Sequence, residues 1–215
     1  ACIVDKRSVG QIFTKGRRSG FTEMALDHFI QVSTSVKNKA FGITSKTEND
    51  AVKAFTKYSY AIRNLPFFFQ PVVRGKIDDV KKMEFGKPSD NTKVSKQKRD
   101  TTTKDYLNVI VDYRATSTLA YDSLAMKMYL GDEAGKWERP NNYIDHWTNI
   151  KPTMVQGGSI VGKALIGSTL NPLDKGGSEF QTLYYGSNVK NRDENGETAT
   201  GLYSLFLPAH KNYER

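Results

Sequence analysis

The first residues that could do chemistry lie in the stretch KGRRSGFT, from Lys15 to Thr22. A phosphate-binding loop (P-loop) usually has the pattern G-x-x-x-x-G-K-[ST], in which backbone N–H groups surround phosphate, a lysine neutralises its charge and a hydroxyl binds Mg²⁺. Gly20 and Thr22 occupy the second glycine and the hydroxyl positions, but Phe21 replaces the lysine. Lys15 could reach the phosphate from the start of the loop instead. An ordinary basic turn between a strand and a helix would have the same residues, so this motif alone leaves both interpretations open.

A second candidate is the acidic pair Asp132 and Glu133, which follows the apolar stretch MKMYLG. Paired carboxylates at a strand end suit hydrolysis of a nucleoside triphosphate, because the first holds the metal and the second deprotonates the attacking water. The pair would also fit a charged helix surface, since Leu124 and Met128 have the spacing of one helix face. The pair alone therefore does not decide between a catalytic site and a solvated helix.

A third candidate is the stretch ALIGSTLN, in which an apolar run ends at Ser168 and Thr169. Small hydroxyl residues in this place could sense the γ-phosphate, or they could simply form a turn. What favours a nucleotide site is the order of the three motifs, because ligands of open parallel sheets bind at the carboxyl ends of the strands.

The elements that would position these residues alternate along the chain. Apolar repeats at helical spacing predict a helix after the loop, and a capping box of Ser45 with Glu48 predicts another that runs toward Arg63 and stops before Pro66. Short apolar runs predict strands at residues 9–13, 40–44 and 108–113, before Asp132, before Ser168, and at 201–209. This alternation predicts an α/β fold with a mainly parallel sheet flanked by helices.

Composition limits the function classes. The 215 residues suit one large domain, 1–215, and 32 Lys and Arg against 23 Asp and Glu give a net charge of +9, which favours a polyanionic partner. One cysteine excludes an internal disulfide, and three scattered histidines lack the spacing of a structural zinc site. No apolar run reaches the ~20 residues of a membrane span. Residues 81–104 hold eight basic and three acidic residues, which predicts a solvated basic insertion able to touch DNA phosphates.

Taken together, KGRRSGFT, MYLGDEAGKW and ALIGSTLN resemble motifs of the ATPase domain of the terminase large subunit, the DNA-packaging motor of tailed double-stranded DNA bacteriophages. The resemblance spans nearly the whole chain. In that family, a Walker A loop with arginines before the glycine, and with the lysine moved to its start, is a known variation. Lys15 and Phe21 match that arrangement, so the resemblance implies a rearranged loop rather than a broken one.

The resemblance also implies a P-loop NTPase of the additional-strand, conserved-Glu type that uses ATP and Mg²⁺. In this fold the nucleotide would be held by Lys15, Gly16, Arg17, Arg18, Ser19, Gly20, Phe21 and Thr22. Glu133 would be the catalytic base, and Arg17 and Arg18 would stabilise charge on the transferred phosphate. Thr22 and Asp132 would be the metal ligands, and Ser168 and Thr169 would form the coupling motif. Other members of the family supply the arginine from a neighbouring subunit, and both possibilities stay open.

The partners that the resemblance implies are double-stranded DNA, a portal protein, a small terminase subunit and further copies of the chain in a ring. The resemblance also implies that the motor works in the host cytoplasm, docked on a procapsid, and that no membrane takes part. The family's adenine-contacting segment lies upstream of the loop, and its nuclease domain follows the ATPase domain. Because fourteen residues precede Lys15 and the sequence ends at Arg215, we expect a fragment without these two parts, and DNA cleavage is not predicted.

Two other functions fit the same residues. A superfamily 2 helicase or remodelling ATPase also has a DExx box after its P-loop. A non-enzymatic, basic nucleic-acid-binding domain with a decayed nucleotide site would account for Phe21 and for the lysine-rich segment.

Overall fold

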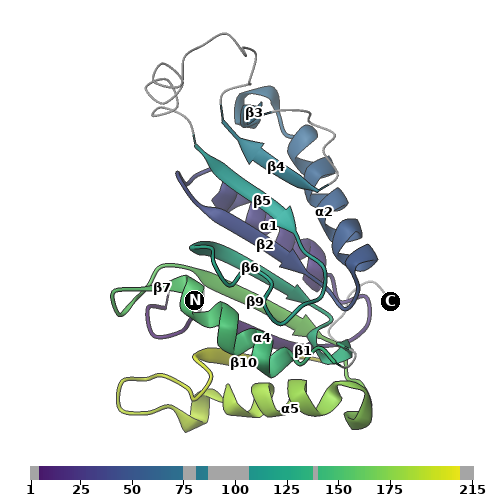
Figure 1. Cartoon of the computed structure of the whole chain (residues 1–215), viewed down its shortest axis with the longest axis vertical. Coiled ribbons are helices and arrows are strands. Elements are labelled where there is room, and N and C mark those ends of the chain that lie inside the picture. The colour runs from purple at the N-terminus through teal and green to yellow at the C-terminus, as the bar shows by residue number, and fades with distance from the viewer. Residues whose placement is uncertain (1–4, 75–80, 87–106, 138–139, 209–215) are drawn as a thin grey trace.

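The computed structural model describes residues 5–74, 81–86, 107–137 and 140–208. Its main feature is an eight-stranded sheet in the order β10-β1-β9-β6-β2-β5-β4-β3 (Figure 1). The strands are β1 (Gly10–Lys15), β2 (Ala40–Thr44), β3 (Val73–Arg74), β4 (Lys82–Phe85), β5 (Val109–Tyr113), β6 (Met126–Asp132), β9 (Lys163–Ser168) and β10 (Leu202–Leu207). A separate short hairpin pairs β7 (Val155–Gln156) with β8 (Ser159–Ile160).

Six of the eight strands, from β10 to β5, are parallel to one another, whereas the β5–β4 and β4–β3 pairs are antiparallel. Strand β9 lies between β1, which leads into the loop, and β6, which ends in the acidic pair. This inserted strand is the additional strand that the predicted fold type requires. The predicted α/β fold with a mainly parallel sheet is confirmed.

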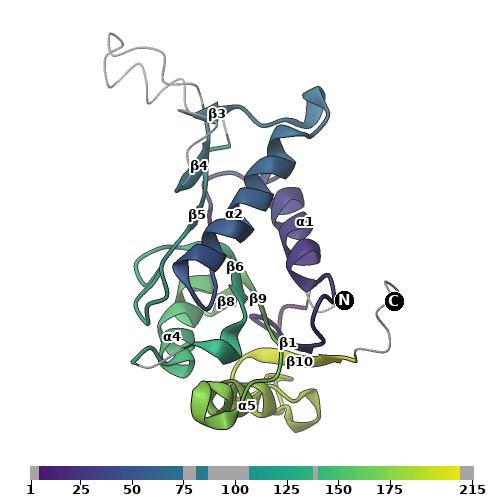
Figure 2. The same cartoon turned by 90° about the vertical axis from the view of Figure 1, so that its right-hand side faces the viewer.

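Helices cover both faces of the sheet (Figure 2). Helices α1 (Phe21–Ser33) and α2 (Glu48–Arg63) lie on one face, and α4 (Tyr143–Ile150) and α5 (Gly177–Gly186) lie on the other. Short 3-10 turns complete the chain at η1 (Phe67–Phe69), η2 (Ala134–Lys136), η3 (Lys151–Met154), η4 (Leu173–Lys175) and η5 (Val189–Asn191). None of the helices in the described ranges is long and apolar enough to cross a bilayer.

The core is divided by the sheet into two parts. Because successive side chains of a strand point to opposite faces, Phe13 of β1 packs toward α1 and α2 while its neighbour Ile12 packs toward α4 and α5. In β9, Leu165 joins the first cluster, and Ala164 and Ile166 join the second. Burial on both faces explains why these strands are apolar runs rather than alternating ones.

Most predicted elements are present, with two corrections. Helix α2 is capped by Thr47, whose side chain accepts a hydrogen bond from the Asp50 amide; the predicted cap, Ser45, is buried just after β2 and therefore does not reach the helix start. The predicted basic insertion begins too early, because Lys82–Phe85 form β4, whose Met83 and Phe85 are buried in the core. Residues 87–104 of that insertion lie outside the described residues.

Candidate active site

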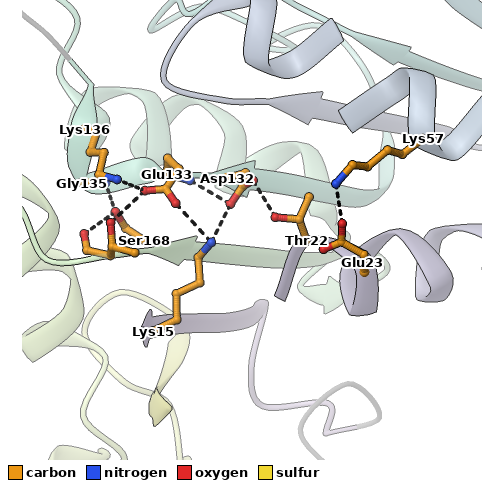
Figure 3. A network of polar contacts seen from close by, with 10 residues as sticks. Lys15, Thr22, Glu23, Lys57, Asp132, Glu133, Gly135, Lys136 and Ser168 are labelled. Carbon is orange, nitrogen blue, oxygen red and sulfur yellow. Dashed lines mark hydrogen bonds and ion pairs between the residues drawn. The ribbon is translucent and has the colours of Figure 1, made fainter. Parts of the chain in front are cut away.

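Parallel pairing brings the three predicted motifs to one edge of the sheet. Strands β1, β9 and β6 are neighbours and run in the same direction, so their carboxyl ends lie side by side. In the register of the sheet, Thr14 lies beside Ser168, and Asp132 lies beside Gly167. The lysine that follows Thr14 and the glutamate that follows Asp132 are therefore placed within reach of each other (Figure 3).

Lys15, the last residue of β1, lies between the two carboxylates. Its Nζ is 3.2 Å from Asp132 Oδ1 and 3.3 Å from Glu133 Oε1 (Figure 3). Only 8% of its side chain is exposed. A buried ammonium group needs an anionic partner, and the carboxylates supply one here. The same cation could serve a phosphate group at this edge of the sheet.

Thr22, in the first turn of α1, faces Asp132 from the other side. Its Oγ1 donates a hydrogen bond of 2.8 Å to Asp132 Oδ2. A hydroxyl and a carboxylate oxygen that converge in this way are ligands that Mg²⁺ accepts. Within the described residues there is no group of three His, Cys, Asp or Glu that could hold a metal. Since Mg²⁺ at nucleotide sites is usually held by one or two protein oxygens, water and the substrate phosphates, Thr22 and Asp132 fit this ion.

Glu133 directly follows β6 and takes a left-handed backbone conformation, with φ of 52° and ψ of 40°. This conformation is uncommon for a residue other than glycine and is often found at functional sites. Besides Lys15, its carboxylate contacts Lys136 Nζ at 2.7 Å and accepts a hydrogen bond of 3.2 Å from Thr169 Oγ1. Burial raises the pKa of the Glu133 carboxyl, but the hydrogen bond from Lys136 and the charge of Lys15 outweigh it, and the net pKa is lowered.

The predicted coupling residues divide into two structural roles. Ser168 is fully buried; its Oγ accepts a hydrogen bond of 3.0 Å from the Gly135 amide and donates one to the Thr169 carbonyl. Thr169 instead reaches Glu133. Ser168 therefore fixes the turn that follows the acidic pair, and Thr169 contacts the carboxylate itself.

The side chain of Phe21 points into the core, although this residue occupies the lysine position of the motif. Its ring is 2% exposed and packs 5.0 Å from the ring of Phe13, centroid to centroid. It also lies over Gly167, where an added Cβ would come within 2.3 Å of the ring. The residue at the usual lysine position thus fills the core under the loop.

The loop between β1 and α1 exposes its two arginines, Arg17 and Arg18. Gly20 ends the loop with φ of 73° and accepts the first hydrogen bond of α1 from the Met24 amide. The Oγ of Ser19 is buried and has no hydrogen-bond partner among the described residues. The helix N-terminus behind this loop can hold an anion, because its first amides have no partner inside the helix.

Two residues near the acidic pair were not predicted from the sequence. Lys136 contacts Glu133, and Gly135 leaves room for Ser168 and Phe180, which would meet an added Cβ at 3.0 and 3.1 Å. Lys136 follows Glu133 by three residues, the spacing of one helical turn, and this spacing was the available signal.

Comparison with solved structures identifies the fold. The ATPase domain of the large terminase of Thermus phage P74-26 superposes with a TM-score of 0.63 at 15% identity, covering 95% of this chain and 78% of that one. A point mutant of the same phage domain gives a TM-score of 0.62 at 14% identity, covering 93% and 76%. The chain has the fold of a large terminase ATPase domain. No protein-family model matches the sequence, and no curated protein matches it.

The same terminase fold is found in the large terminase of a second thermophilic bacteriophage, in complex with ATP-γ-S, with a TM-score of 0.57 at 12% identity. The match covers 97% of this chain and 41% of that terminase chain, so the present chain spans about two fifths of that protein. The predicted resemblance to terminase ATPase domains is thus confirmed at the level of the fold.

Proposed function

We propose that this chain is the ATPase motor domain of a viral DNA-packaging terminase, which couples ATP hydrolysis to the translocation of double-stranded DNA into a procapsid. The observation that carries the proposal is the convergence of Lys15, Thr22, Asp132 and Glu133 at the carboxyl edge of a terminase-like sheet. The second phage terminase with the same fold has been solved with ATP-γ-S and with ADP, which supports a nucleotide as the ligand.

In this proposal the loop from Gly16 to Gly20 surrounds the phosphates with backbone amides at the start of α1. Lys15 supplies the mobile cation that neutralises phosphate charge, since Phe21 is buried and cannot do so. Arg17 and Arg18 are exposed on the same loop and add positive charge around the phosphates. An arginine stabilises the charge of the transferred phosphoryl group, and it comes either from this loop or from a neighbouring copy of the chain.

Thr22 and Asp132 would hold Mg²⁺, which when bound neutralises phosphate charge and orients the β- and γ-phosphates. Glu133 is the general base. It accepts a proton from a water molecule, the water oxygen bonds to the γ-phosphorus, and the bond from that phosphorus to the bridging oxygen breaks with its electron pair remaining on ADP. In this proposal Thr169, which donates a hydrogen bond to Glu133, connects this step to the end of β9 and couples hydrolysis to movement.

The decisive experiment is steady-state ATP hydrolysis by the purified protein, with and without double-stranded DNA. We expect hydrolysis that requires Mg²⁺, is stimulated by DNA and is lost in Glu133→Gln. Glu48→Gln is the matched control, because Glu48 is an exposed carboxylate in the first turn of α2 and is not one of the converging site residues. Absence of ATP hydrolysis in the wild-type protein would contradict the proposal.

A strand-separation assay distinguishes the motor from a superfamily 2 helicase. The substrate is a duplex with a single-stranded overhang, incubated with ATP and the protein. A packaging motor moves along intact double-stranded DNA, so we expect stimulation of hydrolysis without release of a strand. Strand release that depends on Glu133 would replace the packaging proposal with a helicase function.

A further inference from the structure

The two carboxylate oxygens of Glu133 have different partners. Oε1 contacts Lys15 Nζ at 3.3 Å, whereas Oε2 contacts Lys136 Nζ at 2.7 Å (Figure 3). Oε2 also accepts a hydrogen bond of 3.2 Å from Thr169 Oγ1. The shorter and more numerous contacts are therefore on Oε2. A carboxylate that is held by one oxygen keeps its orientation while the other oxygen remains available for chemistry.

The partner of Oε1 is the one that ligand binding would remove. Lys15 Nζ is shared between Glu133 and Asp132, with the longer distances of 3.3 and 3.2 Å. If a phosphate group binds at the loop, its charge draws this ammonium group away from the carboxylates. Oε1 would then lose its cation.

The partners of Oε2 are anchored to the protein instead. The amide of Lys136 donates to the Glu133 carbonyl at 2.9 Å, which closes the η2 turn, and the Gly135 amide donates to Ser168 Oγ at 3.0 Å. The turn is thereby tied to the end of β9, which also carries Thr169. With 27% of its side chain exposed, Lys136 is partly screened from water, so its ion pair is stronger than one on an open surface.

We infer that Lys136 is a positioning residue that fixes Glu133 through Oε2, so that Oε1 is the oxygen that accepts the proton of the attacking water. This inference rests on the proposed ATP hydrolysis. The proton moves from water to Oε1 after Lys15 has turned to the phosphates, and the hydroxyl oxygen left behind bonds to the γ-phosphorus as ADP departs. Lys136 touches neither the water nor the nucleotide and acts through Glu133 alone.

The test compares Lys136→Met, which keeps the length of the side chain but removes its charge, with Lys136→Arg, which keeps the charge. We expect kcat for ATP hydrolysis to fall about 10- to 100-fold in Lys136→Met, less than the ~10²- to 10⁴-fold associated with a general base, because the base is still present but misplaced. KM for ATP should change less than about threefold, since the loop and Lys15 are intact. Lys136→Arg should recover most of the rate. Lys53→Met, which breaks an exposed ion pair with Asp50, is the matched control.

A double variant separates positioning from a direct role. If Lys136 acts only through Glu133, adding Lys136→Met to Glu133→Gln should produce no further loss of kcat, because the group it positions is already inactive. A further loss in the double variant would show that Lys136 contacts the phosphates directly, and the inference would be wrong. An unchanged kcat in Lys136→Met would also overturn it. If the wild-type protein hydrolyses no ATP, the proposed function itself fails and this inference falls with it.

Discussion

Lys15 and Phe21 lie against each other at the base of the candidate site, with Lys15 Nζ 5.0 Å from the centroid of the Phe21 ring. The cation comes from the end of β1, and the aromatic ring occupies the position after the loop glycine where a lysine is usual. The ring is turned into the core, and its face supports the lysine chain. Lys15 thus supplies the positive charge at this point of the loop, and Phe21 supplies the packing.

Lys15→Ala should severely weaken nucleotide binding or turnover, because Lys15 is the only lysine of the loop and lies at its entrance. Binding can be measured by calorimetry with Mg-ATP, alongside steady-state hydrolysis. Lys57→Ala is the control, since Lys57 is a nearby exposed lysine that pairs with Glu23 rather than with the acidic pair. Undiminished ATP hydrolysis in Lys15→Ala would contradict its role.

Phe21→Ala should reduce stability much more than it changes nucleotide binding. Removing a buried aromatic ring leaves a cavity, and such changes cost about 3–5 kcal/mol in the free energy of unfolding. Urea denaturation measures this loss. Met24→Ala, on the exposed side of the same helix, should cost far less. A stable Phe21→Ala protein that no longer binds ATP would show instead that the ring contacts the nucleotide.

Gly167→Ala should be destabilising because its Cβ would lie 2.3 Å from the Phe21 ring. Overpacking of this kind costs about 1–3 kcal/mol. The smaller side chain in Phe21→Leu should relieve the overlap, so the cost of Gly167→Ala should be lower in that background. Equal costs in both backgrounds, measured by urea denaturation, would mean that the two residues do not press on each other.

Glu133→Gln should bind ATP but hydrolyse it about 10²- to 10⁴-fold more slowly, because glutamine keeps the size of the side chain and loses its basicity. Asp132→Asn should differ by also changing the dependence on Mg²⁺, since it removes a charge from the oxygen set shared with Thr22. Titrating Mg²⁺ in steady-state assays of both variants checks the distinction. Near wild-type hydrolysis in Glu133→Gln would remove this residue from the mechanism.

His146 should make the protein sensitive to mild acid. It is fully buried and its Nε2 lies 2.9 Å from the Tyr129 hydroxyl; burial lowers its pKa from 6.5 to about 4. Between these pH values the unfolded chain binds a proton at His146 that the folded protein does not bind. The contribution of His146 to the free energy of unfolding is therefore fully present above pH 6.5 and is lost as the pH falls toward 4. The contribution amounts to at most about 3 kcal/mol.

The measurement is the free energy of unfolding of the wild-type protein and of His146→Gln between pH 7 and 4. The stability of the wild-type protein should decline more steeply than that of His146→Gln. Parallel decline of the wild-type and His146→Gln proteins would show that His146 does not titrate in this range.

Local sequence signals were sufficient to predict most helices and strands, and they also supplied the candidate site residues. The run AFGIT coincides with β2 from its first residue to its last. A short, continuous apolar run is typical of a strand that is buried on both faces of a parallel sheet. Lys15, Asp132 and Thr169 were proposed from residue type and from their order along the chain. Their assembly follows from parallel pairing, which gathers strand ends at one edge.

The contacts between distant segments could not be predicted in this way. Whether Phe21 enters the site or the core depends on the space over Gly167, a residue 146 positions away in the chain. The strand Lys82–Phe85 was predicted to be part of a basic insertion because the whole segment 81–104 is rich in charged and polar residues, yet pairing with β5 buries Met83 and Phe85. The two oxygens of Glu133 acquire different partners only when β1, the η2 turn and the end of β9 meet. Packing and pairing between elements, rather than local preference, therefore set the geometry on which the chemistry depends.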